Sequence, residues 1–127
     1  GYTVLELEGA DGSDARTYVP RQLLRLSAVV DLAAVPGLSL GANLRWQSAI
    51  DREAVAYDDL GTATPLRIQQ SSYALLGLMA NYDINERWSA TLNLDNVTDE
   101  KYLGSLYWEQ GYYGAPRGVA VSVGYRF

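Results

Sequence analysis

The sequence has no cysteine and no histidine, and these two absences remove several classes of site. Without cysteine there is no disulfide framework and no thiolate metal site. Without histidine, the commonest general base and metal ligand is missing. A glycine-rich phosphate loop and a nucleophile elbow are also lacking. We therefore expect no enzyme, no metal site and no cofactor of this chain's own, although a carboxylate pair formed by distant loops stays open.

The chain also has no basic run and no long hydrophobic run. Its 10 Lys and Arg against 15 Asp and Glu give a net charge of -5, so no basic surface is available to follow a phosphate backbone. Nucleic acid is not expected as a partner. No apolar segment approaches the ~18 residues that a membrane-spanning helix needs. There is one Phe but ten Tyr and three Trp, rings suited to a boundary between an apolar and an aqueous phase.

What the chain does have is alternation, and it is clearest in residues 117–127. Large apolar side chains fall on one face of this segment: Val119, Val121, Val123, Tyr125 and Phe127. Small or polar residues fall on the other. A period of two is that of a β-strand, and about ten residues is the length that a tilted strand needs to cross a bilayer. The segment predicts a strand between lipid and a wet lumen.

Five earlier segments alternate in the same way, and their connections differ in length. The expected strands cover residues 1–8, 22–32, 38–48, 67–82 and 88–96. Short turns at 33–37 and 83–87 separate long connections at 9–21, 49–66 and 97–116, and the middle one is acidic. Tight periplasmic turns and long outer loops are typical of outer-membrane barrels. We therefore predict an all-β fold, an antiparallel transmembrane β-barrel segment of about six strands.

Two alternatives stay open at this point. One is a soluble antiparallel β-domain that binds sugars or proteins through Tyr-rich loops. Against it, polar residues on the strands would need water or buried partners, and four rings are expected near the periplasmic interface: Tyr82, Trp88, Tyr125 and Phe127. The other is a different outer-membrane barrel, such as an adhesin translocator or a barrel hydrolase, because a terminal aromatic strand would look the same there.

The second half of the chain resembles a known family. Residues 92–102 (LNLDNVTDEKY), residues 113–117 (YGAPR) and the final YRF resemble the C-terminal end of a TonB-dependent outer-membrane receptor. Val19-Pro20-Arg21 and Ser72-Tyr73-Ala74-Leu75 are similar to the ferric-siderophore members. The ordered combination covers essentially the whole chain, so residues 1–127 resemble the final strands of the barrel.

The resemblance implies a 22-stranded barrel in the outer membrane of a Gram-negative bacterium, closed by a plug domain. It implies active uptake of a ferric siderophore, with contacts to outer-membrane lipid and to TonB through an N-terminal region. The siderophore would carry the iron, so no protein iron ligands are expected. The plug domain and the TonB-contacting region are absent from residues 1–127. We expect Phe127 to be the natural C-terminus and Gly1 not to be the natural beginning.

The best candidates for ligand contact lie in the last long connection. They are aromatic rings beside hydrogen-bonding groups, a combination that suits a bulky chelate of mixed polarity: Tyr107, Trp108, Glu109, Gln110, Tyr112 and Tyr113. The alternative is that these rings form the outer aromatic girdle or pack among loops.

The same connection also carries residues with an expected structural role. Asn96, Asp99 and Tyr102 are predicted to organise the exit from the strand. Arg117 is expected to pair with an acidic residue such as Asp95 or Glu109.

Overall fold

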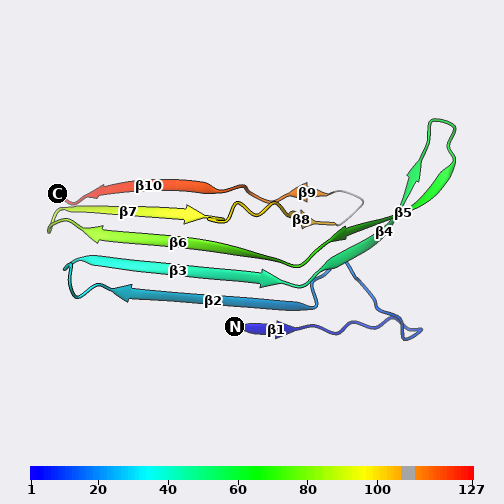
Figure 1. The fold of residues 1–127 in the computed structure, drawn as a ribbon, viewed down its shortest axis with the longest axis horizontal. Coiled ribbons are helices and arrows are strands. Elements are labelled where there is room, and N and C mark those ends of the chain that lie inside the picture. Colours follow the sequence, from blue (N-terminus) through cyan, green and yellow to red (C-terminus); the bar gives the residue numbers. More distant parts are fainter. Residues whose placement is uncertain (107–110) are drawn as a thin grey trace.

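The computed structural model describes residues 1–106 and 111–127, and the described part is built from β-strands (Figure 1). The strands are β1 (Tyr2–Val4), β2 (Gln22–Asp31), β3 (Leu38–Gln47), β4 (Ile50–Tyr57), β5 (Ala63–Gln70), β6 (Tyr73–Asp83), β7 (Trp88–Asp95), β8 (Leu103–Ser105), β9 (Tyr112–Tyr113) and β10 (Gly118–Tyr125). Six of them form one sheet in the order β1-β2-β3-β6-β7-β10, while β4 pairs with β5 and β8 with β9. All pairs are antiparallel. No described segment is a helix long and apolar enough to span a membrane.

One face of the six-stranded sheet is apolar from β2 to β10. Directly opposed residues of neighbouring strands share a face, and the register puts apolar residues opposite one another, as in the row Val30, Leu40, Ala80, Leu92 and Val121. Four of these five side chains are exposed, from 36% at Leu92 to 69% at Val121, and Ala80 is half-buried. The sheet therefore buries no core beneath this face, which confirms the expected alternation and leaves a broad apolar surface open.

The opposite face is polar, with small and hydrogen-bonding residues in register. Thr91 donates its hydroxyl to the Asn81 side chain at 2.8 Å, and Ser39 donates to Asp31 at 2.6 Å. β1 and β10 are the two edges, so the sheet is open in this chain. A sheet with one apolar and one polar face, both accessible, matches the predicted section of barrel wall.

The two short turns lie next to each other at one end of the sheet (Figure 1). Asp83 donates its backbone N–H to the carbonyl of Gly37 at 2.8 Å. Gly37 has a φ of 83°, and a Cβ on it would lie 2.7 Å from the Asp83 carbonyl oxygen. Only glycine meets both conditions, so the Pro36-Gly37 turn is matched to the neighbouring one.

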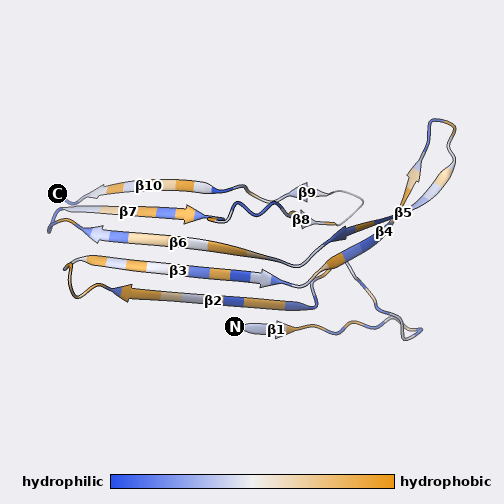
Figure 2. Ribbon diagram, in the orientation of Figure 1, coloured by the Kyte–Doolittle hydropathy of each residue, from blue (hydrophilic) through white to orange (hydrophobic). Residues whose placement is uncertain are grey.

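The structure corrects three of the expected boundaries. The 49–66 connection is not a loop but contains β4 and the start of β5, a hairpin that projects from the sheet (Figure 1). The segment 67–82, expected as one strand, is divided between β5 and β6 at residues 71–72. β1 ends at Val4, well before residue 8. All three differences lie toward the end of the sheet from which the hairpin projects, and the part of the hairpin next to the sheet is mainly hydrophilic (Figure 2).

Apart from Gly77 within β6, the few buried residues gather where the long connections leave the sheet. The buried apolar residues of the described ranges are Ile50, Tyr73, Tyr102 and Leu106. They come from the base of the projecting hairpin, the start of β6 and the segment around β8. This small cluster, here called the loop core, fixes the positions of the long connections relative to the sheet.

Candidate ligand-binding site

The candidate site is carried by the segment that leaves β7, and Asn96 organises this departure. Its amide nitrogen donates to the carbonyls of Glu100 at 2.9 Å and Ala115 at 3.1 Å, and its Oδ1 accepts the Glu100 N–H at 2.8 Å. Asn96 is 7% exposed and has a φ of 48°, in the left-handed region that Asn tolerates better than most residues. One side chain thus ties both ends of the 97–116 connection together.

Asp99 makes the second tie between the two ends. Its Oδ1 accepts the backbone N–H of Arg117 at 3.0 Å, and its Oδ2 lies 3.8 Å from the Arg117 guanidinium. The expected acidic partner of Arg117 was Asp95 or Glu109; in the described residues it is Asp99, four residues beyond β7. Both side chains are more than half exposed, so the ion pair contributes little and the backbone bond fixes the geometry.

Tyr102 anchors the connection to the loop core. Its ring stacks on that of Tyr73, with centroids 4.4 Å apart and an interplanar angle of 29°. Gly114 passes directly over the ring, since a Cβ there would lie 1.9 Å from Tyr102 Cζ, and Gly114 donates its N–H to the Tyr102 carbonyl at 2.8 Å. The predicted organising role of Asn96, Asp99 and Tyr102 is confirmed by these contacts.

The loop core also joins the other two long connections. Arg52 on β4 donates to the carbonyl of Leu106 at 3.3 Å, and Leu106 is 2% exposed. Thr17 and Asp51 exchange two hydrogen bonds, one from the Thr17 hydroxyl at 2.8 Å and one from the Asp51 N–H at 3.1 Å. Asp51 further pairs with Arg67 across the hairpin at 2.9 Å. The three long connections therefore share one base at this end of the sheet.

The predicted contact residues Tyr112 and Tyr113 form β9 and are 63% and 67% exposed. Lys101 Nζ lies 4.8 Å from the centroid of the Tyr113 ring, a cation–π distance. Tyr113, Lys101 and Glu100 line an open pocket of about 380 Å³ with Gly114 and other residues of the connection. Successive strand residues point to opposite sides, so Tyr112 is directed away from this pocket. The candidates Tyr107, Trp108, Glu109 and Gln110 lie outside the described residues.

Sequence reasoning missed Lys101 and Glu100 as members of this pocket. Both belong to the DEKY run that carries the resemblance. Lys101 lies eleven residues before Tyr112, so no periodic pattern in the sequence links it to the aromatic candidates. Only the return of the chain at Gly114 brings Lys101 beneath Tyr113. The pocket therefore offers a cation, a carboxylate and an aromatic ring to a ligand.

Charged groups elsewhere in the long connections have structural partners. Asp58 accepts the N–H groups of Thr62 at 2.7 Å and Leu60 at 2.9 Å, and these bonds lower the pKa of its carboxyl. The pKa of Asp11 is lowered by hydrogen bonds from Ser13. In the described ranges, acidic side chains do not assemble into a group that could hold a metal ion.

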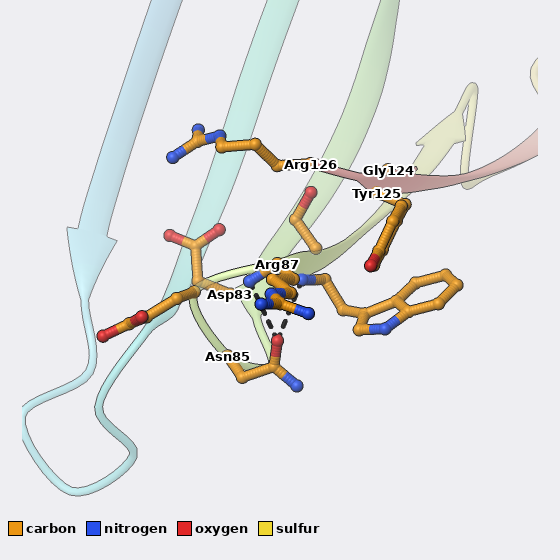
Figure 3. A pocket seen from close by; sticks show the side chains of 9 residues that line it. Asp83, Asn85, Arg87, Gly124, Tyr125 and Arg126 are labelled. Carbon is orange, nitrogen blue, oxygen red and sulfur yellow. Dashed lines mark hydrogen bonds between the residues drawn. The ribbon is translucent and has the colours of Figure 1, made fainter.

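A larger pocket of about 490 Å³ lies at the other end of the sheet, beside the 84–87 turn (Figure 3). Asn85 Oδ1 accepts the N–H groups of Arg87 at 2.9 Å and Trp88 at 3.0 Å, which closes the turn. The Tyr125 ring lies tilted against that of Trp88, with centroids 4.7 Å apart and an interplanar angle of 49°, and meets Phe127 edge-on at 5.1 Å. Trp88, Tyr125 and Phe127 are three of the four rings expected at the periplasmic interface, and these contacts bring the three together.

Comparison with known proteins gives the chain a family. Residues 2–97 match the family described as TonB dependent receptor-like, beta-barrel. The chain is 33% identical to the ferric-pyoverdine 358 receptor of Pseudomonas putida over 131 residues, which covers 100% of this chain and 15% of that protein. It is 31% identical to the ferrioxamine B receptor of Salmonella typhimurium over 117 residues, covering 87% of this chain and 15% of the relative.

The fold agrees with the same family. The solved pyoverdine outer membrane receptor FpvA of Pseudomonas aeruginosa, bound to pyoverdine, superposes with a TM-score of 0.87 at 27% identity, over 99% of this chain and 18% of that one. The chain thus spans less than a fifth of the length of these relatives. The relatives are receptors and not enzymes, so the barrel-hydrolase, adhesin-translocator and soluble-domain alternatives are set aside. The chain belongs to the TonB-dependent receptor β-barrel family of Gram-negative outer-membrane proteins.

Proposed function

We propose that residues 1–127 supply six strands of barrel wall and three outer loops to a receptor that takes up a ferric siderophore of the pyoverdine class. The observation that carries this proposal is similarity over the whole chain, including the long connections, to a ferric-pyoverdine receptor. A wall segment alone would match many barrels, whereas the outer loops are where cargo is recognised.

The two ends of the sheet have different parts in this function. The apolar face contacts lipid, and the cluster of Trp88, Tyr125 and Phe127 lies at the periplasmic interface. The loop core lies at the extracellular end and holds the long connections in fixed positions. Energy reaches the receptor from TonB through a region outside these residues, and the iron stays coordinated by the siderophore.

Recognition of the cargo is assigned to the 97–116 connection, with Tyr113, Lys101 and Glu100 around its pocket. An aromatic ring offers area to a planar group, the ammonium of Lys101 an electrostatic contact, and Glu100 an acceptor. Tyr107, Trp108, Glu109, Gln110 and Tyr112 remain candidates on the same connection. Tyr112 would approach the ligand from the other side of β9.

The uptake proposal is tested with the complete receptor in a Pseudomonas strain that has no other pyoverdine receptor. We expect radiolabelled ferric pyoverdine to accumulate in cells with intact TonB and not in cells without it. Binding without TonB-dependent accumulation, or no binding at all, would contradict the proposed uptake.

The contact proposal is tested separately by affinity measurements on the purified receptor. Tyr113→Ala, Tyr112→Ala and Trp108→Ala should each weaken ferric-pyoverdine binding by about tenfold, the usual effect of removing one aromatic anchor. Tyr57→Ala is the matched control, because Tyr57 is an equally exposed tyrosine (71%) on the projecting hairpin. Equal affinities in the three variants and the control would refute the assignment.

A further inference from the structure

The polar face of the sheet carries two arginines in an unusual arrangement. Arg25 on β2 and Arg45 on β3 lie directly opposite each other in the register. In the six strands of the sheet, all of them described, these are the only Lys or Arg residues. The other Lys and Arg residues lie in turns, connections or the projecting hairpin, except Arg126, which follows β10. The two positive charges of the sheet therefore lie side by side on its polar face.

The backbone geometry brings the two side chains especially close. Arg25 exchanges both of its backbone hydrogen bonds with Gly1, at 2.8 Å in each direction. Its N–H and C=O therefore point toward β1, and the Arg25–Arg45 pair is a non-hydrogen-bonded pair of the antiparallel ladder. In such pairs the Cα atoms are about 4.5 Å apart and the side chains lie closer together than in the alternate pairs.

Neither guanidinium has a compensating partner among the described residues. The ion pairs in this part of the chain are Arg21–Asp14, Arg67–Asp51 and Arg117–Asp99. On the same face, Asp31 lies six residues along β2 from Arg25, about 20 Å away in an extended strand. Asp95 lies two strands from β3, a lateral separation of about 10 Å. Like charges directly opposite each other destabilise a sheet unless an anion lies between them.

We propose that Arg25 and Arg45 form a two-guanidinium clamp that binds a carboxylate inside the barrel lumen. Guanidinium groups match a carboxylate by paired N–H···O bonds, and two of them side by side can hold its two oxygens at once. The carboxylate can belong to an acidic residue of the receptor outside this chain or to the cargo, and the second source rests on the proposed function. Both sources share the same chemistry.

The test uses the complete receptor with Arg25→Gln, Arg45→Gln and the double variant. Arg87→Gln is the control, since it also removes one positive charge, but from the 84–87 turn at the opposite end of the sheet from the two arginines. Thermal unfolding without cargo and the Kd for ferric pyoverdine are measured for each. A carboxylate of the receptor predicts a melting temperature lowered by at least about 2 °C and an unchanged Kd. A carboxylate of the cargo predicts a Kd raised about tenfold and a cargo-free melting temperature that is equal or higher.

The double variant supplies an independent signature. Because one anion is shared by both arginines, removing the second should add little to the effect of the first. If the pair holds no anion, removing either charge relieves repulsion, and the melting temperature stays equal or rises while the Kd stays within twofold of the control. That result overturns the clamp. If the wild-type receptor does not bind ferric pyoverdine, only the proposed function is contradicted. The clamp is then tested by the melting temperatures of the variants, and values that are not lowered refute it.

Discussion

Asn96→Ala should open the candidate site locally while the barrel wall stays folded. The substitution removes three hydrogen bonds, each contributing about 1 kcal/mol. Glu100 and Ala115 are exposed, so their freed carbonyls regain water and the net loss is about 2 kcal/mol. Ala at a φ of 48° adds about 1 kcal/mol of backbone strain. The expected cost is about 3 kcal/mol.

Native-state hydrogen exchange on the complete receptor measures this cost where it occurs. A loss of about 3 kcal/mol corresponds to more than about 100-fold faster exchange at the amides of Glu100 and Gly114. Amides of β7, such as that of Leu92, should keep their protection. Gln69→Ala is the control, because Gln69 is an exposed amide side chain without a hydrogen bond in the described residues, and it should change exchange by little.

Asn96→Gly separates the two parts of the effect. Glycine adopts the left-handed conformation without strain, so only the side-chain bonds are lost, together with a cost of up to about 1 kcal/mol for greater freedom of the unfolded chain. Protection at Glu100 and Gly114 equal to wild type in Asn96→Ala would refute the reasoning. It would mean that the segment is held by the loop core and not by Asn96.

Three further predictions concern other parts of the chain. Val121→Asp, on the lipid-facing side and opposite Leu92, should lower surface levels of the receptor, since a carboxylate there costs up to a few kcal/mol. Ser122→Asp, opposite Thr91 on the polar face, should leave surface levels unchanged. Equal surface levels of the two variants would contradict the assigned faces. Gly114→Ala should displace Tyr102 and reduce cargo affinity, because the new Cβ would lie 1.9 Å from the ring. Gly104→Ala is the control and should bind normally, because the nearest atom to its new Cβ is 3.7 Å away. Normal binding by both variants would show that the ring adjusts freely. The pKa of Asp58 in the folded protein lies below its ordinary 3.8. Its stabilisation of the hairpin tip is therefore present above pH 3.8 and is lost as the pH falls through the folded-state pKa. NMR of the Leu60 and Thr62 amides should show this loss, and unchanged amide signals in an Asp58→Ala protein would contradict it.

The sheet could be predicted from the sequence because its two faces have different surroundings along every strand. Alternation such as that of Val119 to Tyr125 records this difference directly, and the short turns at 33–37 and 83–87 fix which strands are neighbours. The contact between the terminal rings follows from the same rule, since Trp88 begins β7 and Tyr125, its partner in the register, ends β10. The physical signal is therefore local and periodic.

The projecting hairpin gave no such signal because, beyond the buried Ile50 at its base, both of its sides reach solvent. In β4, Asp51 and Glu53 alternate with Arg52 and Ala54, so no apolar face appears. What could have indicated it is the turn at Asp58–Thr62, where Gly61 has a φ of 79° and Asp58 caps two amides. The pocket at Tyr113 was out of reach for another reason: it depends on how Gly114 crosses Tyr102, a contact between residues that alternation does not relate.

The projecting hairpin has a consequence for how the wall assembles. β3 and β6 are neighbours in the sheet, although β4 and β5 intervene in the sequence. If the 48–72 segment were flexible, pairing β3 with β6 would require closing a loop of about 25 residues. A hairpin that pairs by itself from Ile50–Gln70 to Tyr57–Ala63 brings its own ends together and leaves an effective loop of about five residues. The closure entropy then falls by about 1.4 kcal/mol. The hairpin therefore holds the ends of β3 and β6 close together before they pair. Residues 58–62 at its tip can change in length or sequence without altering the register of β3 against β6.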